Sequence, residues 1–444
     1  MTSVETAFPQ YLSEVCARTA RALAATGYDA LVVHSGSLLT VFEDDRTYPF
    51  EVHAPFKVWA PLTDAPDCFI HFEPGRRPQL IFHSPVDYWY KPAQQPSAYW
   101  TPCFDMSPVA KRDQARAALP GNLGRTAYIG DLFDGLEGWG FGATNPPELM
   151  GRLDFDRAVK LPYELHCMRA ASRLGARGHL AALEAFKSGA TEFEIELAFL
   201  KACGQREQDL PYNPIIALNE SGAVLHYQVL EHVSPAERRS LLIDAGAEFA
   251  GYASDITRTY SLHDRDFAAL IDRMNDMQQQ LCSELRAGVD WRDVHLRAHA
   301  LTGAVLRDAD ITNCDADEAV ATGTTSVFLP HGIGHLLGLE VHDAGGFAAS
   351  IEGGKIPRPD GHPHLRLTRV LQPNFVVTVE PGIYFIDSLL NAARADQRAS
   401  RINWARVESL KPFGGIRIED DVAITPTGCE NLTRDAFQAL RATR

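Results

Sequence analysis

The sequence predicts an α+β protein divided into a small α/β domain over residues 1–160 and a larger domain over residues 161–444. Helical and strand-like periodicities alternate through the first part, as in a compact α/β domain. From residue 163 a pair of helical patterns precedes several strand-like runs, and the same order recurs from residue 264. Pro162 marks the boundary, because proline interrupts regular structure.

The elements of the first domain are predicted from local signals. A 3.6-residue apolar spacing indicates an amphipathic helix, and a run of apolar β-formers indicates a buried strand. Two strand-like runs around Pro74-Gly75 indicate a hairpin. The expected elements are a helix over 8–27, a strand over 28–34, a hairpin over 68–83, a helix over 109–118, a strand over 126–131 and an extended run over 157–161.

The larger domain is predicted to repeat one architecture twice. Helices are expected over 163–187 and 192–203, separated by Ser188-Gly189, with Thr191 as an N-cap. A second pair is expected over 264–286 and 291–308, separated by Gly288. Antiparallel strands should follow each pair, up to about residue 262 and about residue 430. This order indicates an internal duplication of the architecture.

Composition and charge exclude several classes of function. The chain has 42 Lys and Arg against 57 Asp and Glu, a formal net charge of −15. A general nucleic-acid binder or a protein of anionic membranes needs a basic face, so neither class is expected. The eight cysteines form no CxxC pair, which is typical of a reduced, intracellular chain. We find no secretory leader and no long apolar run, and therefore expect a soluble, cytoplasmic protein.

Two aspartates lie in consecutive strand-like runs. Asp244 and Asp255 have their midpoint just before Gly251, so a hairpin that turns there would place the carboxylates opposite each other on adjacent strands. Two carboxylates so close repel each other unless a cation lies between them. Alone, the pair is also consistent with aspartates that cap turns.

Histidines and glutamates add further ligand types. His331, His335 and His342 fall within twelve residues. His331 and His335 have the spacing of helical zinc sites, but the glycines between them favour a loop. Glu380 ends one strand-like run before a Pro-Gly turn, and Glu419 lies in another such run.

Arg417 precedes Glu419 by two residues and should share its strand face. The inventory is therefore four carboxylates and at least one imidazole at strand ends. Oxygen-rich ligand sets suit Mn²⁺ or Mg²⁺, and this one exceeds the needs of a single ion. The residues thus predict a dinuclear metallohydrolase, in which two ions activate water.

These residues lie in a sequence that resembles a metallopeptidase family of Xaa-Pro dipeptidases (prolidases), aminopeptidases P and methionine aminopeptidases. The resemblance is strongest to bacterial-type prolidases, which are close to organophosphorus acid anhydrolases. Besides the ligand segments, it is carried by residues 44–50, 85–90, 210–227, 331–335, 380–390 and 402–420. It implies a C-terminal pita-bread domain with the internal duplication described above.

The resemblance also implies a metal centre and a reaction. Two Mn²⁺ ions per subunit would activate a hydroxide that attacks the carbonyl of an Xaa-Pro dipeptide. Asp255 and Glu419 would bridge the ions, and Glu380 would also act as general base. The implied ligands are Asp244, Asp255, His335, Glu380 and Glu419.

Other site residues follow from the same resemblance. His226, His331 and His342 match catalytic histidines that transfer protons and hold the tetrahedral intermediate. Tyr212 would line the pocket, and Arg417 would orient the metal ligands beside the substrate.

The substrate's proline carboxylate needs a guanidinium group, and either Arg366 or Arg369 matches the family's arginine. In homodimers of this family the N-terminal domain of the partner closes the active site. Asp45 and Trp89 are candidates for that edge, and Asp45 would suit the substrate's free amine. Trp89 is also consistent with an ordinary core residue. Leu336 departs from the family, where proline follows the histidine ligand, and this difference concerns the shape of the pocket.

Four functions compete at this stage. The first is a manganese Xaa-Pro dipeptidase, and the second is an aminopeptidase P that acts on longer peptides. The third is hydrolysis of organophosphorus triesters, expected as a side activity. The fourth is a metal-free, creatinase-like relative, which the five filled ligand positions argue against.

Overall fold

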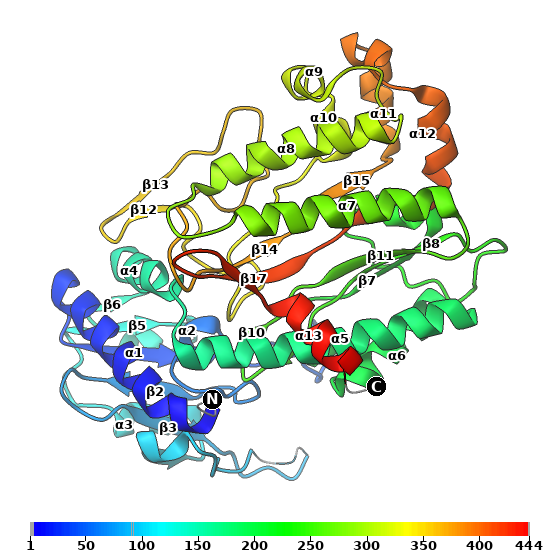
Figure 1. Cartoon of the computed structure of the whole chain (residues 1–444). Coiled ribbons are helices and arrows are strands. Elements are labelled where there is room, and N and C mark those ends of the chain that lie inside the picture. The colour runs from blue at the N-terminus through cyan, green and yellow to red at the C-terminus, as the bar shows by residue number, and fades with distance from the viewer. Residues whose placement is uncertain (1–3, 90, 92, 443–444) are drawn as a thin grey trace. The chain divides into compact units, whose positions relative to one another are not determined.

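The computed structural model describes residues 4–89, 91 and 93–442 of the chain. The chain forms two compact units, which Figure 1 shows with their elements labelled. The first unit contains the described residues up to Arg157, together with residues 161–167 and 350–354. The second contains residues 158–160, 168–349 and the described residues from Lys355 onward.

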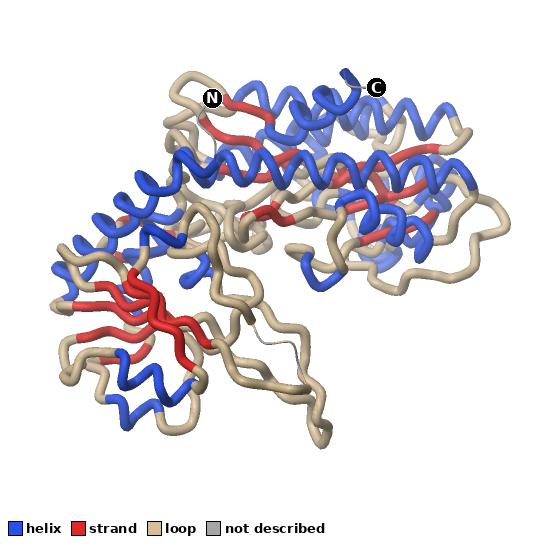
Figure 2. The backbone as a smooth tube through the Cα atoms, turned by 90° about the horizontal axis from the view of Figure 1, so that it is seen from below, coloured by secondary structure: helices blue, strands red, loops and turns tan. Residues whose placement is uncertain are grey.

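The first unit is built on a mixed sheet with the strand order β4-β3-β2-β1-β5-β6. β1 is antiparallel to β2 and parallel to β5. Figure 2 shows these strands side by side in red. The elements are α1 Val4–Thr26, β1 Ala30–His34, α2 Ala54–Lys57, β2 Phe69–Phe72, β3 Gln79–His83, β4 Asp105–Val109, α3 Arg112–Ala118, β5 Thr126–Ile129, β6 Ala143–Thr144 and α4 Pro147–Arg157.

Most sequence predictions for this unit are confirmed. The first helix is α1, the strand after it is the fully buried β1, and the hairpin is formed by β2 and β3, with Phe69 opposite Ile81. Apolar strand residues such as Val32 and Phe69 form a core with Ala115 of α3. The buried strands therefore hold this unit together through their apolar side chains.

Two predictions for this unit are wrong at their boundaries. Val109 ends strand β4, so the helix expected from residue 109 begins only at Arg112. The extended run expected over 157–161 is a link between helices, because α4 ends at Arg157 and α5 begins at Pro162. α4 was not predicted, since little of it is buried and its apolar periodicity is weak.

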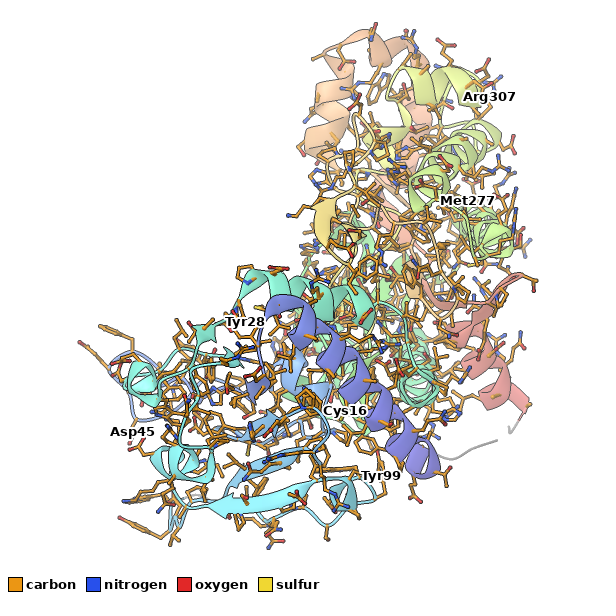
Figure 3. The ribbon with its side chains drawn as sticks, turned by 90° about the vertical axis from the view of Figure 1, so that its left-hand side faces the viewer. Cys16, Tyr28, Asp45, Tyr99, Met277 and Arg307 are labelled. Atoms are coloured by element: carbon orange, nitrogen blue, oxygen red, sulfur yellow. The ribbon has the colours of Figure 1, made fainter. Side chains whose placement is uncertain are left out.

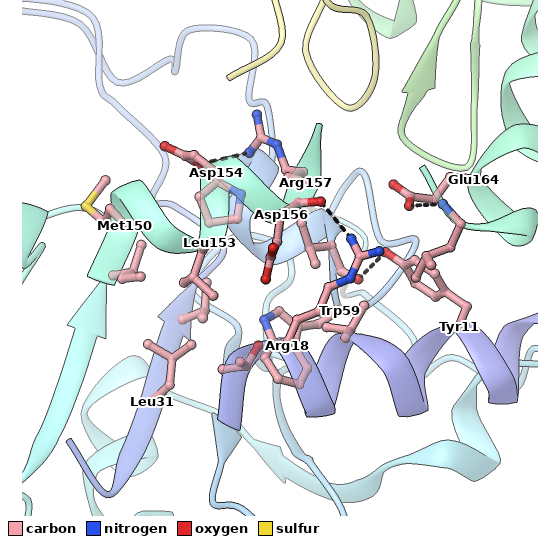
Figure 4. Close-up of a pocket in the computed structure, with 17 residues that line it drawn as sticks. Tyr11, Arg18, Leu31, Trp59, Met150, Leu153, Asp154, Asp156, Arg157 and Glu164 are labelled. Atoms are coloured by element: carbon pink, nitrogen blue, oxygen red, sulfur yellow. Dashed lines mark hydrogen bonds and ion pairs between the residues drawn. The ribbon is translucent and has the colours of Figure 1, made fainter. Parts of the chain in front are cut away.

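A pocket in this unit lies against α1, α4 and the sheet (Figure 4). Its wall is mostly apolar, and its charged side chains engage neighbouring groups. Arg18 donates to the carbonyl oxygen of Asp156 over 2.7 Å, and Glu164 accepts from the amide of Leu161 over 2.7 Å. These groups hold the chain in place around the pocket.

The second unit carries two similar halves. Its elements are α5 Pro162–Ser188, α6 Glu192–Cys203, β7 Ile215–Leu218, β8 Ser240–Asp244, β9 Glu248–Phe249, β10 Tyr252–Ala253, β11 Thr257–Ser261, α7 Arg265–Glu284, α8 Trp291–Asp308, α9 Ala316–Ala321, α10 Thr325–Phe328, β12 Ala348–Ser350, β13 Gly353–Lys355, β14 Val376–Val379, β15 Gly382–Tyr384, α11 Asp387–Arg394, α12 Trp404–Leu410, β16 Gly415–Arg417, β17 Asp420–Ile424, β18 Cys429–Asn431 and α13 Leu432–Ala442. The first turns of α5 and part of the β12–β13 hairpin belong to the first unit.

Each half packs a helix pair on antiparallel strands, as the sequence predicted. α5 and α6 bury Phe186 and Phe199 against Ile243 of β8, in the sheet β11-β8-β7. α7 and α8, side by side in Figure 1, bury Met274 and Trp291 against β14 and β17 of the sheet β14-β17-β18. The duplicated order of helices and strands therefore gives two similar layers.

Helix ends follow the expected capping chemistry. Thr191 Oγ1 accepts from the amide of Glu194, and the Glu194 carboxylate accepts from the amide of Thr191. Asp264 and Asp290 cap α7 and α8. The region after α8 differs from the prediction, because helices α11, α12 and α13 interrupt or follow the expected strands. Among the described residues, every helix is too short or too polar to cross a lipid bilayer.

Candidate active site

The five predicted metal ligands lie at strand ends and loops of the second unit. Asp244 ends β8, His335 lies in the loop after α10, and Glu380 directly follows β14. Asp255 lies between β10 and β11, and Glu419 lies between β16 and β17. Ligand atoms of Asp255, His335 and Glu419 lie within 4.8 Å of one another. Strand ends distant in sequence thus bring these side chains together.

The hairpin that carries the two aspartates forms, but its predicted register is wrong. Asp244 pairs with Thr257, so it is not opposite Asp255. The turn occurs at Ala250-Gly251, and both residues have positive φ, 54° and 88°. Such two-residue turns place glycine at the second position, one residue later than the predicted midpoint.

Tyr212 connects the two aspartates despite this offset. Its hydroxyl lies 2.8 Å from Asp244 Oδ1 and 2.7 Å from Asp255 Oδ1. The phenol has one proton and can donate to only one of these oxygens at a time. The two carboxylates therefore share a donor at one point of the site.

His335 is oriented with one ring nitrogen toward the carboxylates. Its Nδ1 lies 3.0 Å from the carbonyl oxygen of Leu336, and its Nε2 lies 3.5 Å from Asp255 Oδ2 and 3.9 Å from Glu380 Oε1. Burial lowers the pKa of His335, but Asp255 and Glu380 outweigh it, and the net shift is upward. This arrangement is the one that metal-binding histidines use, with the second nitrogen held by a carbonyl.

Glycine makes the loop around His335 possible. A Cβ at Gly334 would lie 2.0 Å from the carbonyl oxygen of Thr378, and the φ of Gly334 is +153°. The loop conformation predicted for His331 and His335 is therefore confirmed, and a helical HxxxH arrangement is absent from this described segment.

Crowded carboxylates dominate the electrostatics. Burial raises the pKa of Glu419 well above its ordinary value, and Asp255 and Glu380 raise it further. Burial also raises the pKa of Glu380 to about 7. The pKa of Asp244 is raised by burial despite the nearby Arg417. A divalent cation among these oxygens would relieve the repulsion, so the donor set fits divalent metal ions.

Arg417 organises the side of the site near Asp244. Its Nη2 donates to Asp244 Oδ2 over 2.7 Å, and its Nη1 donates to the Tyr384 hydroxyl over 2.9 Å. Its Nε donates to Thr257 Oγ1 over 3.2 Å, and Thr257 Oγ1 donates to Glu419 Oε2 over 2.6 Å. Arg417 and Glu419 are therefore linked through hydrogen bonds to the same hydroxyl group, that of Thr257.

Sequence reasoning missed three residues of this network. Thr257 and Tyr384 are ordinary strand residues by type, so nothing marks them before the sheets are assembled. Asp421 is buried and accepts from the amide of Asp255 over 3.1 Å. The Asp-Asp pair at 420–421 was the signal that could have pointed to it.

Two of the three predicted catalytic histidines contact site residues. The Nε2 of His331 lies 2.9 Å from the Tyr384 hydroxyl, and its Nδ1 lies 3.6 Å from Glu380 Oε2. Burial lowers the pKa of His331 to about 3. The rings of His342 and His335 are 4.4 Å apart, and burial lowers the pKa of His342 to about 4. His226 is exposed, and its charge lowers the pKa of both His331 and His342.

The two candidate arginines occupy different environments. Arg366 is exposed, and its charge lowers the pKa of His342. Arg369 is buried, with its guanidinium 4.8 Å from the centre of the Phe375 ring and its Nη1 3.4 Å from the carbonyl oxygen of Gly345. Arg366 alone of the two combines exposure with electrostatic contact to a site histidine.

Asp45 and Trp89 lie in the first unit. Asp45 is exposed on a loop at the edge of that unit (Figure 3). Trp89 is 78% exposed, so its interpretation as a core residue is wrong. Their predicted role at the active-site edge stays a prediction. Leu336 forms an antiparallel β-bridge with Val377 of β14, and its side chain is buried in the core of the second unit.

Solved structures with similar shape show the same fold. Aminopeptidase PepP of Pseudomonas aeruginosa aligns with a TM-score of 0.72 and 22% identity, covering 97% of this chain and 99% of that one. Escherichia coli aminopeptidase P with the inhibitor Pro-Leu aligns with a TM-score of 0.72 and 21% identity, covering 98% and 99%. The predicted α+β fold, a smaller domain before a pita-bread domain, is confirmed.

Sequence comparisons identify the family. A model described as "Xaa-Pro dipeptidase, N-terminal domain" matches residues 6–155, and one described as "Metallopeptidase family M24" matches residues 166–426. The Xaa-Pro dipeptidase of Stenotrophomonas maltophilia is 48% identical and covers 97% of each chain. That of Xanthomonas axonopodis is 47% identical, covering 98% of this chain and 99% of the relative. The chain therefore belongs to metallopeptidase family M24, a family of hydrolases, and to its Xaa-Pro dipeptidase group.

Proposed function

We propose that this protein hydrolyses Xaa-Pro dipeptides. The observation that carries the proposal is the convergence of Asp244, Asp255, His335, Glu380 and Glu419 from five places in the second unit. Relatives that are 46–48% identical over nearly the whole chain bear the name Xaa-Pro dipeptidase, which supports the same substrate class.

Two Mn²⁺ ions are the proposed cofactors. Four carboxylates with one imidazole form an oxygen-dominated set, which suits Mn²⁺ better than a metal that prefers thiolates. The set is larger than one ion requires, and Asp255 and Glu419 are the proposed bridging ligands. Two such ions supply Lewis acidity, which lowers the pKa of water and polarises a carbonyl group.

The protein's own residues handle protons and orientation. Glu380, whose Oε1 lies 3.9 Å from His335 Nε2, is the proposed base that takes a proton from the attacking water. Burial lowers the pKa of His342 to about 4, so at neutral pH it is uncharged and can donate a hydrogen bond to the tetrahedral oxygen. His331, whose Nδ1 lies 3.6 Å from Glu380 Oε2, is the proposed partner of Glu380 in moving the proton that Glu380 takes from water. His226 lies within electrostatic range of both histidines.

Arg366 is the proposed partner of the proline carboxylate. It is exposed, so its guanidinium fork is available to a ligand, and it acts electrostatically on His342. Arg369 is packed against Phe375, where it supports the same segment. Arg417 and Tyr212 hold the metal ligands in place from the substrate side.

A homodimer is the proposed assembly, with the first unit of one copy at the active-site edge of the other. Large apolar side chains are exposed there in two segments, which include Phe42 at 85% and Tyr88 at 87%. Exposed aromatic side chains of this kind are typical of protein interfaces. Asp45 and Trp89 lie in the same two segments and are the proposed edge residues. Reduced cysteines support a cytoplasmic location.

Hydrolysis of Ala-Pro and Ala-Pro-Phe, side by side, tests this function. We expect cleavage of the dipeptide alone, loss of activity after chelation, and recovery with Mn²⁺. Cleavage of the tripeptide would favour an aminopeptidase P, the enzyme named in the structural neighbours, whose low identity supports only the fold. If neither peptide is cleaved in the metal-loaded protein, the dipeptidase proposal fails and phosphotriesters become the next substrates to test.

A further inference from the structure

Three histidines outside the carboxylate site converge on one point of the second unit. His295 and His299 are one turn apart on the buried face of α8. His362 approaches them from the turn that follows Pro359. One ligand nitrogen from each of the three lies within 4.8 Å of the others, and the ring centres are 4.5 to 4.8 Å apart.

The hydrogen bonding of this cluster leaves ring nitrogens unsatisfied. His299 Nδ1 lies 3.0 Å from Thr325 Oγ1, whereas its Nε2 is buried and has no partner. His295 Nδ1 is also buried without a partner, and its Nε2 lies 2.9 Å from His362 Nδ1. His295 and His299 are 1% and 2% exposed, whereas His362 is half-exposed, so solvent meets the cluster at His362. A buried nitrogen without a partner is unfavourable and calls for an explanation.

The three imidazoles are available as ligands at neutral pH. Burial and the neighbouring rings lower the pKa of His295 to about 2, and burial and His362 lower the pKa of His299 to about 4. Burial lowers the pKa of His362 as well. Neutral imidazole is the form that binds metal ions. His299, with its Nδ1 beside Thr325 and its Nε2 free, has the arrangement typical of a metal-binding histidine.

We propose that His295, His299 and His362 form a second metal site, for a borderline divalent ion such as Zn²⁺, with solvent as the fourth ligand. An all-imidazole set favours Zn²⁺ over the Mn²⁺ that suits the carboxylate centre. Nitrogen ligands of tetrahedral zinc are about 3.3 Å apart, given Zn–N distances of about 2.0–2.1 Å. The 2.9 Å between His295 Nε2 and His362 Nδ1 needs a small widening, and His299, within 4.8 Å of both, closes toward them when the ion binds.

This site would fasten the segment that carries Arg366 to helix α8. His362 precedes Arg366 by four residues, and the backbone amide of Trp291, at the start of α8, donates to the carbonyl oxygen of Arg369. The same segment packs on the loop of His331, because a Cβ at Gly332 would lie 2.9 Å from the carbonyl oxygen of His364. The proposed ion therefore links the buried face of α8 to the loop beside the active site.

Metal content of the purified full-length protein tests the proposal. Wild type, His362→Ala and His364→Ala are loaded with Mn²⁺, exposed to a slight excess of Zn²⁺, desalted and analysed by mass spectrometry of the elements. His362 lies on a half-exposed turn, so its truncation should leave the fold intact, and the exposed His364 is a matched control two residues away. We expect His362→Ala to lose one equivalent of zinc per chain relative to wild type, and His364→Ala to lose none.

A Co²⁺ titration of the wild type gives an independent reading. Four-coordinate Co²⁺ absorbs visible light much more strongly than the five- or six-coordinate ion expected among carboxylates. We expect an intense band that His299→Gln and His362→Ala abolish and His364→Ala retains. Equal zinc content in wild type and folded His362→Ala, or no intense band in the wild type, would overturn the proposal. Neither measurement uses peptide cleavage, so its outcome is independent of the proposed dipeptidase activity.

Discussion

Arg417 and Asp244 form a buried ion pair in which Nη2 donates to Oδ2 over 2.7 Å. The two residues are 173 positions apart, and the contact links the end of β16 to the end of β8. The same guanidinium also reaches Tyr384 and Thr257, and Thr257 in turn reaches Glu419. One arginine thus holds predicted metal ligands from both halves of the second unit.

Replacing Arg417 should weaken metal binding. Arg417→Gln leaves the Asp244 carboxylate without its charged partner, and loss of such a supporting contact costs roughly 10–100-fold in metal affinity or activity. Activity measured against Mn²⁺ concentration should show a higher half-saturation. Arg297→Gln, on the exposed surface, is the control. Unchanged metal dependence in Arg417→Gln would contradict the orienting role.

Glu380 is predicted to act on the proton of the attacking water. Glu380→Gln preserves the volume of the side chain but cannot accept a proton as a base, so kcat should fall about 10²–10⁴-fold. Circular dichroism should remain that of the wild type. The exposed Glu352→Gln serves as the control. If Glu380→Gln keeps the wild-type kcat, Glu380 is not the base.

Substitution of Arg366 and of Arg369 should have different effects, the first on KM and the second on stability. A charged hydrogen bond contributes about 1.5–3 kcal/mol, so Arg366→Ala should raise KM for Ala-Pro roughly 10–100-fold. The prolinamide Ala-Pro-NH₂ lacks the carboxylate and should show little change between Arg366→Ala and the wild type. Arg369→Ala removes a buried side chain and should lower the melting temperature instead. If Arg369→Ala raises KM for Ala-Pro and Arg366→Ala does not, Arg369 is the residue that binds the proline carboxylate of the substrate.

Local signals account for the parts of the fold that were predicted. Thr191 with Glu194 marks the start of α6, and Pro74-Gly75 marks the hairpin, because each depends only on neighbouring residues. α4 was missed because its only buried side chains in the described part are Leu149 and Arg157, which give little periodicity. The register of Asp244 was missed because it depends on the type of turn at Gly251.

The same distinction applies to the site. Alone, Glu380 or Glu419 would more often be a surface or turn residue, and both were found because they add to an inventory of carboxylates and imidazoles at predicted strand ends. Thr257 and Tyr384 are ordinary in strands. Their importance comes from contacts with Glu419 and Arg417, which only the assembled sheets bring near.

Buried neutral histidines should make the metal-free protein less stable in acid. Burial lowers the pKa of His179 from 6.5 to about 3, so below pH 6.5 the unfolded chain binds a proton that the folded chain does not. The contribution of neutral His179 to the free energy of unfolding is therefore complete above pH 6.5 and is lost as the pH falls. At pH 5 the loss is about 2 kcal/mol of unfolding free energy. Urea unfolding of chelated wild type and His179→Phe at pH 7.5 and pH 5 measures it.

This prediction concerns the change in unfolding free energy between pH 7.5 and pH 5, and not the unfolding free energy at either pH. His179→Phe loses the contact with the carbonyl oxygen of Ala245 and can be less stable at both pH values. Its loss between pH 7.5 and pH 5 should still be smaller than that of the wild type. His263→Ala, at an exposed position, should keep the wild-type slope. Identical slopes in all three proteins would contradict the assignment to His179.

Glu419 should destabilise the metal-free protein and stabilise the metal-loaded one. Burial and neighbouring carboxylates raise the pKa of Glu419 above 4.5, so the folded chain binds its proton more tightly than the unfolded chain. Without metal, stability therefore falls as the pH rises above 4.5. Glu419→Gln removes this titration, and at pH 8 the chelated variant should melt at or above the wild-type temperature.

Addition of Mn²⁺ should reverse the order of the two proteins. A ligand at 100 times its dissociation constant stabilises the folded state by about 2.7 kcal/mol, and the variant lacks a proposed bridging ligand. The melting temperature of the wild type should therefore rise with Mn²⁺ well above that of Glu419→Gln. A variant that melts below the wild type after chelation would show that Glu419 stabilises the fold through Thr257. If the melting temperature of the wild type is the same before and after chelation, the carboxylates hold no exchangeable metal.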